Sequence, residues 1–163
     1  MLCYNRCVYL GEEKTLKKME RKIHHVGFGI NSQIPKCNIS EVKNCGKSLY
    51  VTILTKGHTC ESKLIEYARK CNVSCEYLLE DWEKGIYINT DPTGEYFPVR
   101  YRIDSPAFTE PERYEYRDLE QLIQAVESIT GVTVHNESEA IAAVKTWSLK
   151  NQAEARVIKY EYF

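Results

Sequence analysis

The sequence has little of what marks secreted, membrane-spanning or dinucleotide-binding proteins. No apolar run approaches the roughly 18 residues that a transmembrane helix needs, so no membrane partner is expected. At the N-terminus the charges follow a short apolar stretch, which is the reverse of the order in a secretory signal. No glycine-rich turn follows a strand in the dinucleotide-binding pattern. We therefore expect a protein of the cytoplasm, or of a host cell's cytoplasm, that uses no such cofactor.

Cysteine is too scarce for a disulfide scaffold. Seven cysteines in 163 residues are an odd number and lie well below the roughly 8–10% typical of such scaffolds, which favours free thiols in a reducing compartment. Cys3/Cys7 and Cys71/Cys75 have a spacing that zinc ligands can have. Nothing in the sequence brings the two pairs together, and we predict no metal and no cofactor.

Catalytic signatures are also missing. Of the four histidines, only His58 stands beside a cysteine, Cys60, just after a predicted strand. Cys60 and a histidine would make a nucleophile and a base, but no flanking signature identifies them as such. Enzymatic activity is thus uncertain and disfavoured, and a Cys/His hydrolase is a distant third hypothesis.

The composition is that of a folded chain, because 43% of the residues are hydrophobic and the net charge is only −1. Strand and helix patterns alternate irregularly, which favours an α+β class. The length favours a single domain over 1–163, with a mainly antiparallel sheet and four to five helices.

Periodicity, capping residues and turn residues predict the individual elements. Residues 2–10 are expected to form a first strand, unless residues 1–10 are a flexible N-terminal arm. An Asp-Pro-Thr-Gly turn at 91–94 predicts a hairpin between the segments 86–90 and 95–103. The remaining predicted elements are helices at 12–23, 60–71, 74–84, 118–130 and 136–150, a helical turn at 40–44, and strands at 24–30, 49–54 and 155–162.

The segment 64–82 has the spacing that helix-turn-helix proteins use. Its key positions hold a small residue, a turn residue and the start of a second helix: Ala68, Asn72, Val73, Ser74 and Leu78. On these residues the segment resembles the helix pairs of bacterial and phage repressor-type regulators. The resemblance implies a helix-turn-helix-like pair at 60–84.

The second helix of that pair would be a poor reader of DNA. Glu76, Glu80, Asp81 and Glu83 lie in it before any base, and phosphate would repel them. A structural helix pair is therefore preferred to sequence-specific DNA reading.

Charge is distributed unevenly along the chain. Residues 1–75 contain 13 Lys/Arg and 6 Asp/Glu, a net of +7, whereas residues 76–163 contain 9 and 17, a net of −8. Such asymmetry indicates a charged partner, unless the two halves simply attract each other within the fold.

The positive charge of residues 1–75 is most concentrated in the helix predicted at 12–23. Its cations would contact phosphates or an acidic protein surface, unless the charged face is merely solvated. These candidate nucleic-acid-binding residues are Lys14, Lys17, Lys18, Arg21 and Lys22.

Tyrosine is unusually frequent, with twelve tyrosines against four phenylalanines. Tyrosine is enriched in binding surfaces, and several tyrosines lie in polar surroundings of the second half. The alternative is that they cover sheet faces with their hydroxyl groups in water. The candidate partner-binding residues lie in the proline-flanked loop at 104–117 and are Glu110, Glu112, Tyr114, Glu115 and Tyr116.

These observations lead to a first hypothesis of a non-enzymatic protein that binds a host protein or a protein–nucleic acid complex through an acidic, tyrosine-rich surface. Small domains of this kind are common among phage and mobile-element inhibitors of host (defence) machinery, an analogy of type alone. The alternative is a helix-turn-helix-type regulator that binds nucleic acid. The oligomeric state is not predicted.

Overall fold

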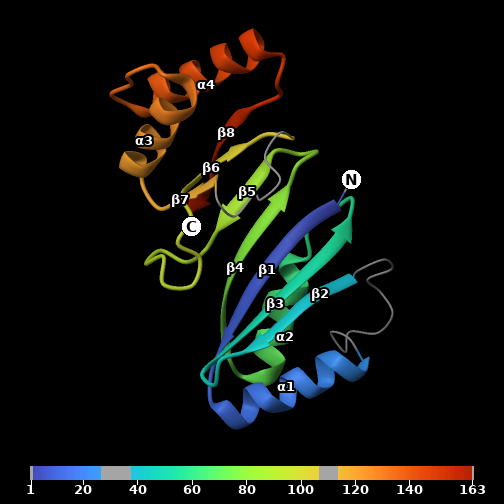
Figure 1. Ribbon diagram of the computed structural model, residues 1–163. Helices are drawn as coiled ribbons and strands as arrows, with labels where there is room; N and C mark the ends of the chain where they lie inside the picture. Colours follow the sequence, from blue (N-terminus) through green and yellow to red (C-terminus); the bar gives the residue numbers. More distant parts are fainter. Residues whose placement is uncertain (1, 27–37, 107–113, 163) are drawn as a thin grey trace. The chain divides into compact units, whose positions relative to one another are not determined.

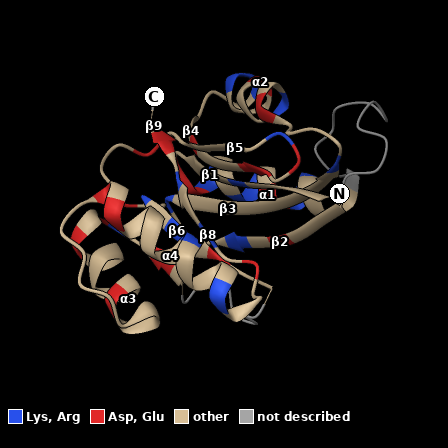
Figure 2. Cartoon of the chain, turned by 90° about the horizontal axis from the view of Figure 1, so that it is seen from above, with Lys and Arg blue, Asp and Glu red and all other residues tan. Residues whose placement is uncertain are grey.

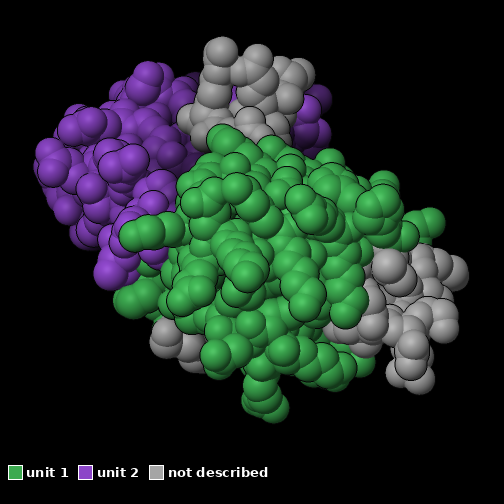
Figure 3. All heavy atoms as spheres, turned by 90° about the horizontal axis from the view of Figure 1, so that it is seen from below, with its two compact units in different colours: residues 1–92, 162–163 green, residues 93–161 purple. Residues whose placement is uncertain are grey.

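The computed structural model describes residues 2–26, 38–106 and 114–162, and the chain divides into two compact units (Figure 3). Unit 1 comprises Met1–Pro92 with Tyr162–Phe163, and unit 2 comprises Thr93–Glu161. The predicted α+β class is confirmed, and the four helices of the described ranges agree with the predicted four to five. The prediction of a single domain is not confirmed.

Unit 1 is built on a six-stranded sheet in the order β2-β3-β1-β4-β5-β9 (Figure 1). The pairings of β1 with β3 and β4, of β2 with β3, and of β4 with β5 are all antiparallel. Helix α1 connects β1 to β2, and helix α2 connects β3 to β4, so the first four strands have split βαβ topology. The elements are β1 (Leu2–Leu10), α1 (Glu13–Val26), β2 (Asn38–Asn44), β3 (Ser48–Lys56), α2 (Glu61–Cys71), β4 (Ser74–Asp81), β5 (Ile86–Asn89) and β9 (Glu161–Tyr162).

The core of unit 1 lies between one face of this sheet and the two helices. Side chains alternate between the faces of a strand, and the odd-numbered residues of β1 and β3 supply the core face. They pack with the buried stripe of α1, namely Leu16, Met19 and Ile23. This stripe has helical spacing, so the predicted helix at 12–23 is confirmed.

Unit 2 consists of a three-stranded sheet, in the order β7-β6-β8, and two helices. Its core is formed by Ile103, Leu122, Val126, Ala140 and Val144, with Val134 from the segment between the helices. The elements are β6 (Tyr101–Asp104), β7 (Glu115–Tyr116), α3 (Leu119–Thr130), α4 (Glu137–Asn151) and β8 (Arg156–Lys159).

Helix ends in unit 2 follow from capping residues in the sequence. Asp118 accepts a hydrogen bond from the amide of Gln121 (2.8 Å), and Asn136 accepts one from the amide of Glu139 (2.9 Å). Gly131 ends α3 in the left-handed conformation with φ of +70°, which glycine adopts at no steric cost. The predicted helices at 118–130 and 136–150 are thus confirmed.

The prediction of a second helix at 74–84, in a helix-turn-helix pair, is wrong. Residues 74–81 form strand β4, which pairs with β1 on one side and with β5 on the other. Asn72 does end α2 in the left-handed conformation, with φ of +53°, but the chain then continues into the sheet. Pairing on both edges satisfies the backbone of β4, and this tertiary context overrides local helix propensity.

The predicted hairpin around residues 91–94 is also wrong. Strand β5 pairs with β4 in unit 1, whereas β6 pairs with β7 and β8 in unit 2. The turn sequence therefore lies at the boundary between the units, and Gly94 there has φ of +70°. The chain bends at Pro92 and Thr93, but the strands on either side belong to different sheets.

Two smaller predictions need correction as well. The predicted helical turn at 40–44 is strand β2, which pairs with β3. Residues 24–26 of the predicted strand 24–30 continue α1 instead, and the rest of that strand lies outside the described residues. The predicted helix at 60–71, in contrast, is confirmed as α2, with Cys60 at its N-cap.

Candidate binding surfaces

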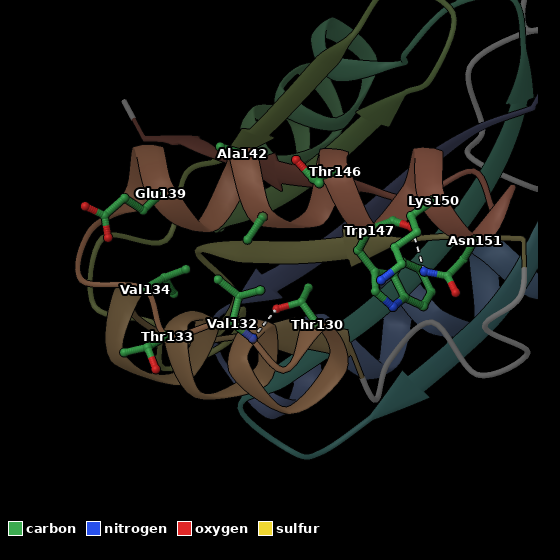
Figure 4. Close-up of a pocket in the computed structure, with 11 residues that line it drawn as sticks. Thr130, Val132, Thr133, Val134, Glu139, Ala142, Thr146, Trp147, Lys150 and Asn151 are labelled. Carbon is green, nitrogen blue, oxygen red and sulfur yellow. Dashed lines mark hydrogen bonds between the residues drawn. The ribbon is translucent and has the colours of Figure 1, made fainter.

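Unit 2 has a groove of about 610 Å³ between α4 and the segment that joins α3 to α4 (Figure 4). Val132, Val134, Ala142, Ala143 and Trp147 give it an apolar floor. Polar side chains stand along its margin. These are Thr130, Thr133, Glu139, Thr146, Lys150 and Asn151.

The two sides of α4 explain how the groove arises. Ala140 and Val144 are fully buried and hold the helix against the core of unit 2. The groove-lining residues of α4, which start at Glu139, follow at spacings of three, four, seven, eight, eleven and twelve and so share a neighbouring stripe. One side of the groove is therefore a stripe of α4 residues that the core of unit 2 leaves uncovered.

Large apolar side chains are exposed in the lining of the groove, at Val132, and next to the lining on α4, at Leu149. Leu149 is 74% exposed and Val132 is 51% exposed. Leu149 stands three residues after Thr146 and seven after Ala142, so it borders the groove on the helix surface. Ile141 is 42% exposed but lies on a different side of α4. Exposed apolar side chains in and beside a groove are typical of a protein interaction site.

The two ends of the groove carry opposite charges. In Figure 4, Glu139 lies at one end and Lys150 near the other. The Glu139 carboxylate is held in place by the amide of His135 (2.8 Å) and by the Asn136 side chain (3.0 Å). Unit 2 as a whole has 8 Lys/Arg against 12 Asp/Glu, a net of −4.

The predicted partner-binding residues that the structure describes contribute to the fold of unit 2. Tyr114 and Tyr116 are half-buried and pack against its core, and burial, with Tyr114 close by, raises the pKa of Tyr116 to about 12. Glu115 forms an ion pair with the buried Arg102 at 3.9 Å. Glu110 and Glu112 lie outside the described residues. Partner binding through these five residues stays a prediction.

The predicted basic helix presents its cations together. Lys14, Lys17, Lys18, Arg21 and Lys22 are all exposed on α1, and helical spacing places them away from its buried stripe. Figure 2 shows the lysine and arginine positions of the described chain in blue. One ion pair ties the first turn, since the ammonium group of Lys17 lies 2.6 Å from the Glu13 carboxylate. Periodicity alone was enough to find this cationic face.

Cys60 and His58, considered above as a nucleophile and a base, differ in exposure. Cys60 is only 4% exposed, and its amide donates a hydrogen bond to the side chain of Asn5 (2.9 Å), whereas His58 is exposed. Burial, together with a hydrogen bond to Cys75, raises the pKa of the Cys7 thiol; the same bond lowers that of Cys75. Among the described residues, no three His, Cys, Asp or Glu side chains gather as a metal site would require.

Sequence reasoning missed one surface, which is the face of the unit 1 sheet opposite the core. The even-numbered residues of the central strands lie there, including Tyr4, Arg6 and Tyr50. Tyr4 is 41% exposed, and Arg6 pairs with the buried Glu80 at 3.4 Å. The period of two in β1 and β3 would have revealed this face if both strands had been assigned to the centre of one sheet.

No protein-family model matches this chain, and no curated protein or solved structure matches it either. Within the described part of the chain, every helix is too short or too polar to cross a membrane. A function can therefore be inferred only from the surfaces of the two units.

Proposed function

We propose that the protein is a non-enzymatic binding protein whose unit 2 docks on a protein partner through the α4 groove. The observation that carries this proposal is the groove itself, with Trp147 in its lining and Leu149 exposed at its margin. The proposed partner is a host protein or a protein–nucleic acid complex, and inhibition of host machinery is the proposed consequence of binding.

The chemistry of the groove supports a protein partner more than a small metabolite. Tryptophan is among the residues that contribute most to protein interfaces, and it does so in pockets from which neighbouring contacts exclude water. An apolar floor with a margin of threonine, asparagine and charged side chains has the composition of an interface core and rim. The net charge of −4 on unit 2 favours a basic partner surface, because opposite charges speed encounter.

The test is affinity capture from the native host with matched variants of α4. Leu149→Lys places a charge at the margin of the groove and should reduce the captured partner at least about tenfold, since burying an unpaired charge is costly. Ile141→Lys is the matched control because it changes an exposed apolar residue on another side of the same helix. Equal loss, or no loss, with both variants would refute docking through the groove.

The loop at 104–117 is tested in the same experiment. Tyr114→Ala with Tyr116→Ala should abolish capture if the acidic, tyrosine-rich surface also contacts the partner. Both side chains pack against the core of unit 2, so each variant needs a matched thermal unfolding curve. Undiminished capture by a folded variant would restrict the interface to the groove.

A second candidate function is nucleic-acid binding through α1. The five exposed cations on one helix favour it, because cations that neutralise phosphates supply most non-specific affinity. Changing Lys14, Lys18, Arg21 and Lys22 to Glu should abolish duplex binding at low salt. Absence of any duplex affinity in the unchanged protein would remove this candidate.

A further inference from the structure

The sheet face of unit 1 that faces away from α1 and α2 combines aromatic rings with positive charge. Strands β1 and β3 pair over nine positions, from Leu2 opposite Lys56 to Leu10 opposite Ser48. Because directly opposed residues share a face, the even-numbered residues of both strands lie together here. Tyr4 stands opposite Leu54, and Tyr50 stands opposite Val8.

Three cations surround these rings. Arg6 lies two residues from Tyr4 on the same strand and opposite Thr52. Lys43 of β2 stands directly opposite Tyr50, and the exposed Lys56 stands at the end of β3. Glu41, opposite Thr52, is the acidic residue of β2 on this face, and the carboxylate of Glu80 is buried beside Arg6. Glu76 of β4, opposite Val8, belongs to the same face, so the whole face has three cations and three carboxylates. The cations outnumber the carboxylates only on its β1–β2 side, where Glu41 is the acidic residue.

The exposed part of this face extends from β1 toward β2. Tyr4 is 41% exposed and Leu2 39% exposed, while Tyr50, Thr52 and Leu54 are partly exposed. By contrast, Val8 of β1, opposite Tyr50, is buried, and so are Leu78 and Glu80 of β4. The two tyrosines are about 13 Å apart along the strand direction, at about 3.3 Å per residue, with Arg6 at an intermediate position.

We infer that this face is a binding site for single-stranded nucleic acid, with Tyr4 and Tyr50 as stacking platforms. Aromatic rings on an open sheet stack unpaired bases, and neighbouring cations bind the phosphates that connect them. Arg6 offers a further planar group between the rings. A duplex would bind this face more weakly, because its bases already stack on one another.

This site is independent of the α4 groove and of the basic face of α1. The α1 side chains that pack into the core are on the helix-covered side of the sheet, so the outer cations of α1 do not share a face with Tyr4. Each surface can therefore be altered without the others, and the failure of one proposal leaves the others standing.

The experiment is fluorescence anisotropy of the full chain with a fluorescein-labelled 15-nucleotide oligothymidylate at low salt. Tyr4→Ala with Tyr50→Ala should weaken binding by roughly 5- to 150-fold for each stacking ring removed. Tyr4→Phe with Tyr50→Phe is the matched control, because phenylalanine keeps the ring; it should bind like the unchanged protein. Lys43→Glu with Lys56→Glu should lower the salt slope by about 1.4.

Three outcomes would overturn the inference. The first is absence of oligonucleotide binding by the unchanged protein at low salt. The second is unchanged affinity in the alanine pair, with circular dichroism and thermal unfolding showing that it is folded. The third is loss of single-strand binding in the α1 glutamate variant but not in the alanine pair, which would assign the affinity to α1. A preference for single strand over duplex of equal length supports it.

Discussion

At the scale of single residues, Asn5 is a buried polar residue of unit 1 whose hydrogen bonds connect three elements. It is fully buried among apolar neighbours, and its amide donates hydrogen bonds to the carbonyl of Ile53 (3.1 Å) and the hydroxyl of Thr55 (3.1 Å). Its carbonyl oxygen accepts the amide of Cys60 at 2.9 Å. One side chain thereby joins β1, β3 and the start of α2.

Asn5→Leu should lower the free energy of unfolding by about 2–3 kcal/mol, because it leaves buried amide and carbonyl groups without partners. Urea unfolding followed by circular dichroism measures the change. Ser40→Ala is the control and should change it by under about 0.5 kcal/mol, since Ser40 is exposed. A loss below about 0.5 kcal/mol for Asn5→Leu would contradict the described network.

Glu137 plays a comparable role in unit 2. Its carboxylate accepts hydrogen bonds from the ammonium group of Lys159 (2.9 Å) and from the hydroxyl of Tyr101 (2.8 Å), joining α4 to β8 and β6. The bond from Lys159, followed by that from Tyr101, lowers the pKa of Glu137 below its ordinary value of 4.5.

A carboxyl whose folded pKa is lowered stabilises the protein above its unfolded pKa, and this contribution is lost as the pH falls through the folded value. Unit 2 should therefore lose stability as the pH falls below about 4.5. Glu137→Gln should lose less over that range, which urea titrations at about pH 7 and about pH 3 would show. Parallel losses in both proteins would exclude Glu137 as a source of the pH dependence.

At the scale of elements, caps and apolar stripes were readable from the sequence, whereas strand pairing was not. The stripe of α1 and the cap residues of α3 and α4 are local patterns, so those helices could be predicted. Strand β4 could not, because Leu78 and Leu79 fit a helix or a strand equally well over so short a stretch. Pairing with β1, more than 60 residues away, decides between them.

The candidate sites also divide into one that a local pattern predicts and others that depend on tertiary packing. The basic face of α1 follows from periodicity, so its five cations were predicted. The α4 groove could not be predicted, because α4 has apolar residues on several sides and only packing shows that Val144 is buried while Leu149 is exposed. The sheet face with Tyr4 and Tyr50 depends on strand order, which no local pattern contains.

The N-cap of α3 gives a test at this scale. Asp118→Ala should lower the free energy of unfolding by about 1 kcal/mol, because the amide of Gln121 loses its acceptor. Asp118→Ser should retain most of the stability, since serine also caps helices well. Identical thermal unfolding of the alanine variant and the unchanged protein would show that the cap does not stabilise α3.

At the scale of the whole molecule, the chain divides into two compact units, and among the described residues each unit has a hydrophobic cluster of its own. Leu64 belongs to the core of unit 1, and Leu122 belongs to the core of unit 2. Charge follows this division only in part, since unit 1 has 14 Lys/Arg against 11 Asp/Glu, a net of +3, and unit 2 a net of −4. The strong asymmetry between the sequence halves is therefore weaker between the folded units.

Truncation of a core side chain in one unit should raise amide hydrogen exchange mainly in that unit. Leu122→Ala should cost about 2–5 kcal/mol and raise amide hydrogen exchange mainly in α3 and α4, and Leu64→Ala should act mainly on α1, α2 and their sheet. Hydrogen exchange read by mass spectrometry distinguishes the two patterns. Uniform exchange across residues 2–162 in both variants would show that the chain unfolds as one cooperative body.

Binding of a protein partner by unit 2, through the groove beside α4, is the central proposal. Once a partner has been captured and purified, isothermal titration calorimetry gives its Kd directly for the unchanged protein and for two folded variants. We predict that Leu149→Lys raises the Kd at least about tenfold while Ile141→Lys leaves it within about twofold, a difference of more than about 1 kcal/mol in binding free energy. Equal Kd values for all three proteins would contradict the proposal.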